Sequence, residues 1–190
     1  MTHMDLDGLL RGFDPAVRPP VLPDTDVSYT ISETPVGPLV LAATEAGLIA
    51  CSYADEGEVT ERIAKAVSPR VLRSPRRLDA VRHELDEYFD GRRREFTVPV
   101  HTVLAALFAR TVLESLRQVP YGSTTTYGRV ARAIQRPTAS RAVGNALNAN
   151  PVCIVLPCHR VLRGDGTVGG YAGGPTAKQL LLTLEHGAQA

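Results

Sequence analysis

Cys158 is followed directly by His159 and Arg160 and preceded by Pro157, so the chain places a thiol next to a base and a cation. Such neighbours favour the thiolate, which is the nucleophilic form of cysteine. Residues 152–156 are all apolar and predict a short buried segment that carries Cys158 from the interior to the edge of a pocket. The pattern therefore indicates a cysteine nucleophile.

The alternative is that Cys158 is one more small buried hydrophobic residue, which is the commonest state of a free cysteine. Cys51 and Cys153 serve as a comparison, because both lie in apolar runs without charged neighbours. We expect those two to be inert core residues. Cys158 differs from them in its adjoining histidine and arginine and in the glycine-rich run that follows it, residues 164–174.

Length and composition limit what the protein can be. The chain has 190 residues, of which 44% are hydrophobic, enough for one ordinary domain or two small ones that fold without disulfides. Three cysteines, no export signal and no apolar run of membrane-spanning length predict a reduced, cytoplasmic protein that does not bind membranes. Because the histidines and cysteines lack metal-ligand spacing and no phosphate-binding loop motif is present, we expect neither a metal nor another cofactor.

The net charge of +1 hides a difference between the two halves of the chain. Residues 1–100 hold 12 Lys or Arg against 17 Asp or Glu, a net charge of −5, whereas residues 101–190 hold 9 against 3, a net charge of +6. A basic block can be plain solvated surface, but together with a helix-turn-helix pattern it favours a polyanionic partner such as nucleic acid. The second half is therefore the half expected to meet that partner.

The element pattern predicts an α+β fold, in which a small N-terminal antiparallel-sheet domain with helices, residues 27–100, precedes a helical C-terminal domain, residues 101–190. Residues 1–26 are rich in proline and charge and predict a mobile arm. Alternation and turn residues predict a three-stranded meander, and apolar spacing predicts two helices laid against it. The expected strands and helices are 27–33, 39–43, 48–53, 59–67 and 78–89, and residues 96–100 return to the sheet.

Arg92, Arg93 and Arg94 form a basic run that follows an acidic helix. We interpret this run as the charge complement of that helix end rather than as a nucleic-acid site.

The second half predicts a helix over residues 103–118, then two short helices over residues 127–134 and 139–148 with Thr126 as an N-cap. Two short helices around a tight connection are typical of a helix-turn-helix, although plain helical hairpins share the pattern. Beside Arg141, the later of these two helices carries a stripe of small residues, which suits close packing against a helix or a DNA groove. The stripe consists of Ala139, Ala142, Ala146 and Ala149.

An ordered set of motifs resembles the active-site signature of the O6-alkylguanine-DNA alkyltransferases, also called methylated-DNA-protein-cysteine methyltransferases. The resemblance covers roughly residues 104–187 and is weak before them. Its motifs are Pro120-Tyr121-Gly122, Thr126-Tyr127-Gly128, Ser140-Arg141-Ala142-Val143-Gly144, Asn150-Pro151, Leu156-Pro157-Cys158-His159-Arg160-Val161, Gly169-Gly170-Tyr171-Ala172-Gly173-Gly174, Lys178 and Glu185.

This resemblance implies DNA repair by direct reversal, in which Cys158 takes the alkyl group from guanine O6 once and irreversibly. It implies that His159 accepts the thiol proton, through a water, and that Glu185 orients His159. Asn150 and Arg160 would support the active-site turn. The base pocket would be formed by Val161, Tyr171, Ala172 and Gly173, with Tyr171 as its aromatic wall.

The resemblance also implies that the partner is double-stranded DNA containing O6-alkylguanine, bound through its minor groove by a monomer. The damaged nucleotide would be turned out of the duplex, with Arg141 in its place, Tyr127 near the rotated phosphate, and Ser140 and Ala142 at the groove. Ala172 stands where many members have serine or glycine, which leaves lesion preference open. Cooperative binding along DNA is open as well.

Two other functions remain open at this point. The first is a non-catalytic protein of the same fold that binds alkylated bases; such relatives lack the reactive cysteine, which this chain has. The second is a cysteine hydrolase that uses Cys158, His159 and Glu185, for which an adjacent nucleophile and base would be an unusual geometry.

Overall fold

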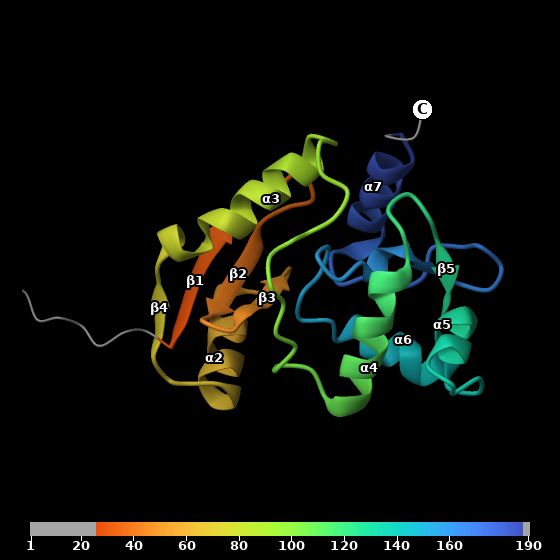
Figure 1. Cartoon of the computed structure of the whole chain (residues 1–190), viewed down its shortest axis with the longest axis horizontal. Coiled ribbons are helices and arrows are strands. Elements are labelled where there is room, and N and C mark those ends of the chain that lie inside the picture. Colours follow the sequence, from red (N-terminus) through yellow and green to blue (C-terminus); the bar gives the residue numbers. More distant parts are fainter. Residues whose placement is uncertain (1–25, 188–190) are drawn as a thin grey trace, which may run out of the picture.

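The computed structural model describes residues 26–187 and shows a sheet domain beside a mostly helical one, which confirms the predicted α+β fold (Figure 1). The arm predicted for residues 1–26 lies outside the described residues apart from Asp26. Asp26 accepts hydrogen bonds from Ser68 and Arg70, which fix the start of the first strand.

The sheet has four strands in the order β3-β2-β1-β4. Strands β1 (Val27–Ser32), β2 (Leu39–Thr44) and β3 (Gly47–Ser52) pair antiparallel, as predicted. The predicted three-stranded antiparallel meander is therefore present, and a fourth strand that was not predicted, β4 (Val71–Arg73), extends it by pairing parallel with β1. Three residues are too few to show the alternation by which a strand is recognised in a sequence.

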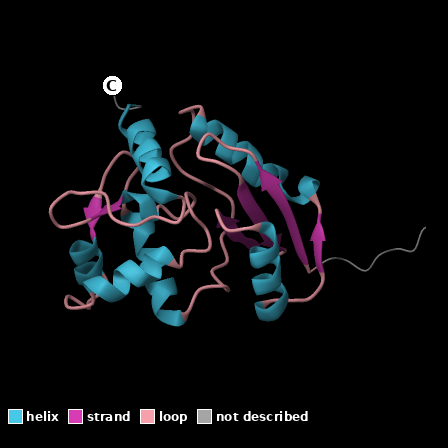
Figure 2. Cartoon of the chain, turned by 180° about the vertical axis from the view of Figure 1, so that it is seen from behind, coloured by secondary structure: helices cyan, strands magenta, loops and turns pink. Residues whose placement is uncertain are grey.

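Both faces of the sheet are covered by helices. Successive residues of β2 point to opposite sides of the sheet, so they pack against different helices. Leu39 and Leu41 pack with the helix α3 (Asp79–Phe89), which follows the 3-10 turn η1 (Pro75–Leu78). Val40 and Ala42 pack with the helix α2 (Glu56–Ala66) in a second cluster. The helices predicted at 59–67 and 78–89 are therefore confirmed. In the view from behind, α2 lies on the side of the sheet that faces the reader (Figure 2).

The C-terminal half holds the remaining elements. Helix α4 begins at residue 107 rather than at 103, and the Arg110 guanidinium folds back to donate to the carbonyls of Val103 and Ala105 in the non-helical segment before it. The two short helices predicted near 127–134 and 139–148 are present. The elements in order are α4 (Leu107–Ser115), η2 (Leu116–Gln118), β5 (Thr125–Thr126), α5 (Tyr127–Ala133), α6 (Ser140–Asn148), η3 (Cys158–Arg160), β6 (Val161–Leu162) and α7 (Gly174–Gly187).

Strand β3 joins the two halves of the molecule. The backbone of Leu48 exchanges hydrogen bonds with residues 99 and 101, and the backbone of Cys51 exchanges them with residues 151 and 153. One continuous hydrophobic cluster then runs from β2 and β3 through α4 and α6 to Leu156 and Val161. The sheet domain is therefore part of the support for the segment that carries Cys158.

The basic run at the end of α3 behaves as a helix-end complement. Arg92 pairs with Asp90 at 2.6 Å, and Arg93 pairs with Glu87 at 2.8 Å. Within residues 26–187, no helix has the length and apolarity that crossing a bilayer requires.

Candidate active site

Cys158 lies at the end of a buried turn with two tight bends. Pro157 has φ −80° and ψ 62°, and the Cys158 N–H donates to the Leu156 carbonyl at 2.8 Å, which is an inverse γ-turn. Ile154 has φ 70°, a left-handed conformation that a β-branched residue seldom adopts. Residues 151–161 are all buried, so the surrounding packing holds this strained segment in one shape.

Asn150 ties this turn together. Its Nδ2 donates to the Leu156 carbonyl at 3.0 Å, and its Oδ1 accepts from the Val152 N–H at 3.0 Å. The same Nδ2 lies 3.1 Å from the Cys158 Sγ, so the amide also donates to the sulfur. Asn150 therefore fixes both the backbone of the turn and the position of the thiol.

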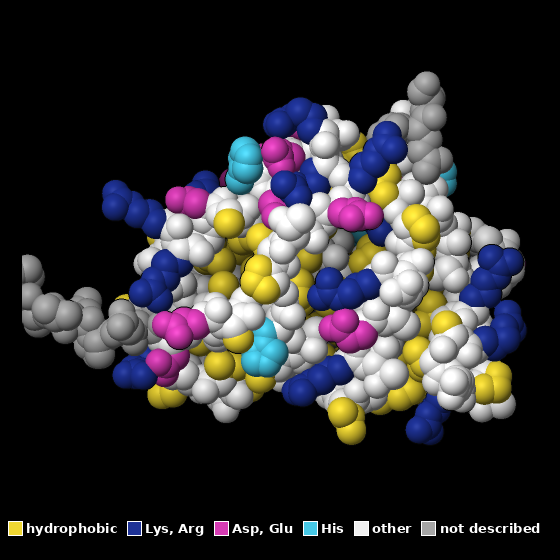
Figure 3. Space-filling model, viewed as in Figure 1, with side chains coloured by type: hydrophobic (Ala, Val, Ile, Leu, Met, Phe, Trp, Pro, Cys, Tyr) yellow, Lys and Arg dark blue, Asp and Glu magenta, His cyan; other side chains and the backbone are white. Residues whose placement is uncertain are grey.

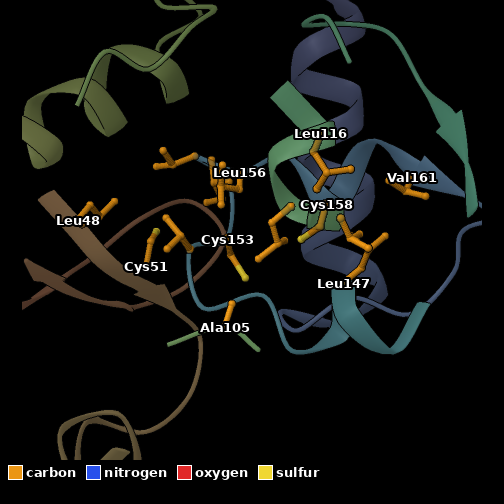
Figure 4. Packing of buried hydrophobic residues seen from close by; sticks show 14 of the residues in the cluster. Leu48, Cys51, Ala105, Leu116, Leu147, Cys153, Leu156, Cys158 and Val161 are labelled. Atoms are coloured by element: carbon orange, nitrogen blue, oxygen red, sulfur yellow. The ribbon is translucent and has the colours of Figure 1, made fainter. Parts of the chain in front are cut away.

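The surroundings of Cys158 favour its thiolate. The Cys153 thiol beside it holds the pKa of Cys158 below its usual range, and the Asn150 amide and the Lys178 ammonium act in the same direction against the opposing effect of burial. Cys51 and Cys153 are buried in the same cluster, as predicted (Figure 4). Burial raises the pKa of Cys51 to about 12, so Cys51 stays a thiol.

His159 and Glu185 meet in the interior. His159 Nε2 lies 2.8 Å from Glu185 Oε1, and the two side chains are 0% and 1% exposed. Because a carboxylate accepts, Nε2 carries the proton and Nδ1 is the basic nitrogen. Nδ1 is buried and has no hydrogen-bond partner in the described part of the chain. Burial lowers the pKa of His159, with the Glu185 contact opposing it, so the imidazole is neutral.

Glu185 accepts hydrogen bonds from several elements. Arg160 donates from Nε at 2.9 Å and from Nη2 at 3.0 Å, and it donates from Nη1 to the Val119 carbonyl at 2.7 Å. The Tyr88 phenol donates to Oε1 at 2.8 Å from α3, and the Gly122 N–H donates to Oε2 at 3.2 Å. Burial alone would raise the pKa of Glu185, but the donors outweigh it and bring that pKa down to about 2.

Sequence reasoning did not assign a role to Tyr88. Its spacing within a helix predicts core packing, and the phenol group is the only sequence signal of a buried hydrogen bond. Gly122 lies in a family motif, but nothing local to that motif indicates contact with a residue 63 positions later.

Tyr171 lies between the histidine and the sheet domain. Its ring stands edge-on to His159 with centroids 6.3 Å apart, and edge-on to Tyr53 with centroids 5.5 Å apart. The hydroxyls of Tyr53 and Tyr171 are 3.3 Å apart. A Cβ at residue 173 would fall 2.6 Å from the Tyr53 ring, so a side chain here would displace Tyr53. Tyr53, at the end of β3, is a neighbour of the site that sequence reasoning missed.

The other residues predicted for the base pocket differ in burial. Val161 is fully buried, and its carbonyl accepts from the buried Lys178 Nζ at 2.6 Å. Ala172 is exposed, next to Tyr171. Lys178 thus holds the strand β6 to α7.

The helix-turn-helix lines a cleft of about 950 Å³ on the surface. Thr126 caps α5 by accepting from the Arg129 N–H at 3.3 Å, as predicted. Tyr127, Ser140 and Arg141 line the cleft, while Ala142 is exposed beside them and Cys158 lies outside its walls. The two-residue strands β5 and β6 pair, which ties this cleft to the active-site turn.

The cleft is basic. Its walls include Arg129, Arg132, Arg141 and Arg163, and among residues 26–187 no Asp or Glu is one of its lining residues. On the face shown in Figure 3, the edge of the molecule at β5 and α5 carries Lys and Arg side chains without acidic ones, whereas basic and acidic side chains are mixed over the sheet domain and the middle. This arrangement suits a polyanion at the helix-turn-helix. In the same range of residues, no group of His, Cys, Asp and Glu side chains is arranged to hold a metal ion.

Family comparisons cover both halves of the chain. Residues 107–187 match the family model described as 6-O-methylguanine DNA methyltransferase, DNA binding domain, and residues 27–102 match the model of its ribonuclease-like domain. The match through the sheet domain extends beyond the region where the sequence resemblance was strong.

Individual relatives agree with these models. The methylated-DNA–protein-cysteine methyltransferase of Methanosarcina acetivorans is 38% identical over 157 residues, which cover 83% of this chain and 97% of that protein. That of Mycolicibacterium paratuberculosis is 36% identical over 160 residues, covering 84% and 93%. Among solved structures, the Mycobacterium tuberculosis O6-methylguanine methyltransferase is 33% identical with a TM-score of 0.73, covering 85% of this chain and 94% of that one.

A further structure, of Mycobacterium tuberculosis OGT in complex with DNA, is 31% identical with a TM-score of 0.72 and covers 85% of this chain and 94% of that one.

Proposed function

Because the chain belongs to the 6-O-methylguanine DNA methyltransferase family, we propose that it repairs DNA by moving an alkyl group from guanine O6 to Cys158. The observation that carries this assignment is the joined site of Asn150, Cys158, His159 and Glu185, in which the sulfur is held by an amide and the imidazole by a carboxylate. The basic cleft beside this site supports DNA as the partner.

The reaction is a displacement at carbon. Cys158 Sγ attacks the alkyl carbon, an S–C bond forms as the C–O bond breaks, and the electron pair of that bond leaves with guanine O6. The thiol proton passes through a water to the basic Nδ1 of His159, with Glu185 stabilising the charge, and the departing guanine takes up one proton to become neutral. No oxidant, metal or other co-reactant is consumed.

On the DNA side, the alkyl group on O6 lies inside the base stack, so the nucleotide has to be turned out before the sulfur reaches it. In this proposal α6 enters the minor groove of double-stranded DNA with Ser140 and Ala142 at its surface. Arg141 fills the place of the extruded base, and Tyr127 lies at the rotated phosphate. The exposure of Arg141 and Ala142 and the position of Tyr127 in the cleft support these assignments.

In the base pocket, Tyr171 forms the aromatic wall, and backbone groups of Val161 and Gly173 bind the edge of the base beside Ala172. The product is a thioether, which cellular thiols do not reverse, so each molecule acts once. We propose a monomer in the reducing cytoplasm, where three free cysteines persist.

Titration with damaged DNA tests this function. Protein mixed with excess duplex carrying O6-methylguanine should gain the mass of one methyl group per chain and then stop. Binding without a gain in mass would instead favour a non-catalytic sensor of alkylated bases. Continuous turnover of an ester or amide substrate by Cys158 would favour a hydrolase.

A further inference from the structure

Tyr53 is a residue of the sheet domain that contacts two residues of the predicted base pocket. It follows β3, the edge strand that faces the helical half of the molecule (Figure 1). The backbone is held on both sides of it, because Cys51 is hydrogen-bonded to the segment that carries the nucleophile and Asp55 caps α2. The Tyr53 ring therefore projects from a fixed point.

Both contacts of Tyr53 are with one turn of the chain. Its hydroxyl lies 3.3 Å from the Tyr171 hydroxyl, and the two rings stand edge-on with centroids 5.5 Å apart. A Cβ added at Gly173 would fall 2.6 Å from the Tyr53 ring and 3.0 Å from the Ala177 Cβ, so the backbone there is packed between Tyr53 and α7. The Gly174 N–H closes the turn by donating to the Tyr171 carbonyl at 3.0 Å.

The pair of hydroxyls is suited to hold Tyr171 in place. Burial raises the pKa of both phenols, so both keep their protons and one hydroxyl donates to the other. Edge-on packing of the two rings is a favourable arrangement as well. Because Tyr171 is also edge-on to His159, its ring has contacts with both the sheet domain and the catalytic histidine.

We propose that Tyr53 is a positioning residue that holds Tyr171 and the turn over residues 171–174 ready for the extruded base. This inference rests on the proposed function, and it gives the sheet domain a part in binding the lesion. A pocket wall that is already ordered does not have to be ordered when the base enters. Tyr53 should therefore strengthen binding of the extruded base without speeding the chemical step.

The test compares two changes at Tyr53 with a matched control. Tyr53→Phe removes the hydroxyl and keeps the ring, and Tyr53→Ala removes both. Tyr29→Phe is the control, since it removes a part-buried hydroxyl from the same sheet, bonded to Glu56 at 2.8 Å. Single-turnover methyl transfer is measured over a range of concentrations of duplex carrying O6-methylguanine, which gives a maximal rate and a half-saturating concentration. Binding of undamaged duplex reports the basic cleft separately.

The half-saturating concentration of damaged duplex should rise about threefold in Tyr53→Phe and about tenfold in Tyr53→Ala, through loss of a hydrogen bond and then of the ring pair. The maximal rate and the binding of undamaged duplex should keep their wild-type values, as should every quantity in Tyr29→Phe. An unchanged half-saturating concentration in Tyr53→Ala, or a fall in the maximal rate alone, would overturn the proposal.

A double-mutant cycle tests whether Tyr53 acts through Tyr171. Adding Tyr53→Phe to Tyr171→Phe should cause no further rise in the half-saturating concentration, because the hydroxyl that Tyr53 contacts is already gone. A rise as large as in the wild-type background would overturn the proposal. This comparison decides the matter even if Tyr53→Ala does not fold.

Hydrogen exchange of the free protein follows the same turn without DNA. The Gly174 amide, which is bonded to the Tyr171 carbonyl, should exchange faster in Tyr53→Ala and at the wild-type rate in Tyr29→Phe. Faster exchange in Tyr53→Ala together with no methyl transfer by the wild type would contradict the proposed function and leave the hold of Tyr53 on the turn intact. Normal methyl transfer with unchanged exchange and half-saturation would contradict the role of Tyr53 alone.

Discussion

His159 Nε2 and Glu185 Oε1 lie 2.8 Å apart although 26 residues separate them in the chain. Two further elements, α3 through Tyr88 and the turn at Gly122, donate to the same carboxylate. The carboxylate is thus fixed by the fold before any substrate binds. This fixed orientation leaves His159 Nδ1 as the basic nitrogen of the site.

Replacing Glu185 by glutamine removes the negative charge of this side chain and keeps its size and shape. We expect alkyl transfer to slow by about 100-fold, because the imidazole loses the anion that stabilises its charged form. The free energy of unfolding should fall by about 3 kcal/mol, because Arg160 keeps a buried charge without its partner. Single-turnover kinetics and urea unfolding measure the two effects.

Glu84→Gln is the matched control for this change. Glu84 is another buried glutamate, held by Thr97 in the sheet domain, so its replacement should lower stability while the folded protein keeps the wild-type rate. A Glu185→Gln rate within twofold of wild type would show that the carboxylate does not support the histidine.

Tyr88→Phe removes one donor from Glu185 and leaves the ring in place. We expect the free energy of unfolding to fall by about 1–3 kcal/mol, since the lost hydrogen bond is buried and charge-assisted. Tyr29→Phe, which loses a part-buried hydrogen bond to Glu56, should cost about 0.5 kcal/mol or less. Equal losses in the two variants would mean that the Tyr88 hydroxyl is not bound to Glu185.

Local sequence patterns were sufficient to predict most of the strands and helices of the sheet domain. Strand β1 shows alternation, β2 and β3 are apolar runs bounded by turn residues, and α3 shows helical spacing, so each was predictable near its observed bounds. Strands β4, β5 and β6 have three residues or fewer, which is too short for any periodicity. They form because neighbouring strands offer pairing partners, which a single sequence does not reveal.

The active site likewise contains residues that the sequence predicted and residues that it did not. Cys158, His159 and Arg160 are consecutive and were visible as a chemical cluster, whereas Glu185 was identified only through the family resemblance. Tyr53 and Tyr88 reach the site from the sheet domain by tertiary packing, without any spacing rule. Cys153 has apolar neighbours in sequence and lies in the buried hydrophobic cluster, as predicted.

Stability should fall with acidity in two stages. The pKa of His159 is lowered in the folded state, so its stability contribution is present above the usual value of 6.5 and is lost as the pH falls below it. The pKa of Glu185 is lowered from 4.5 to about 2, so its contribution is present above pH 4.5 and is lost as the pH falls through that range. The second loss should be on the order of 3 kcal/mol.

Urea unfolding of the wild type and of Glu185→Gln, from about pH 8 to about pH 3, measures these stages. The variant should lose less stability than the wild type below pH 4.5, because glutamine does not titrate, whereas other carboxylates whose pKa is lowered, such as Glu87, titrate in both proteins. Parallel acid profiles in the two proteins would contradict the assignment of that stage to Glu185.

Arg141→Ala should separate base extrusion from chemistry. We expect transfer from duplex O6-methylguanine to slow at least about tenfold, because unstacking costs a few kcal/mol that the arginine helps to offset. Reaction with the free base O6-benzylguanine should change little, since no extrusion is needed. Arg136→Ala, an exposed arginine outside the cleft, is the control. Equal losses on both substrates would give Arg141 a different role.

The most direct test is to locate the transferred group. Protein is incubated with a duplex carrying isotopically labelled O6-methylguanine, digested and mapped by mass spectrometry. We expect S-methylcysteine at Cys158 in one copy per chain, with Cys51 and Cys153 unmodified and Cys158→Ala unlabelled. Label on another residue, or none at Cys158 after prolonged incubation under reducing conditions, would contradict it.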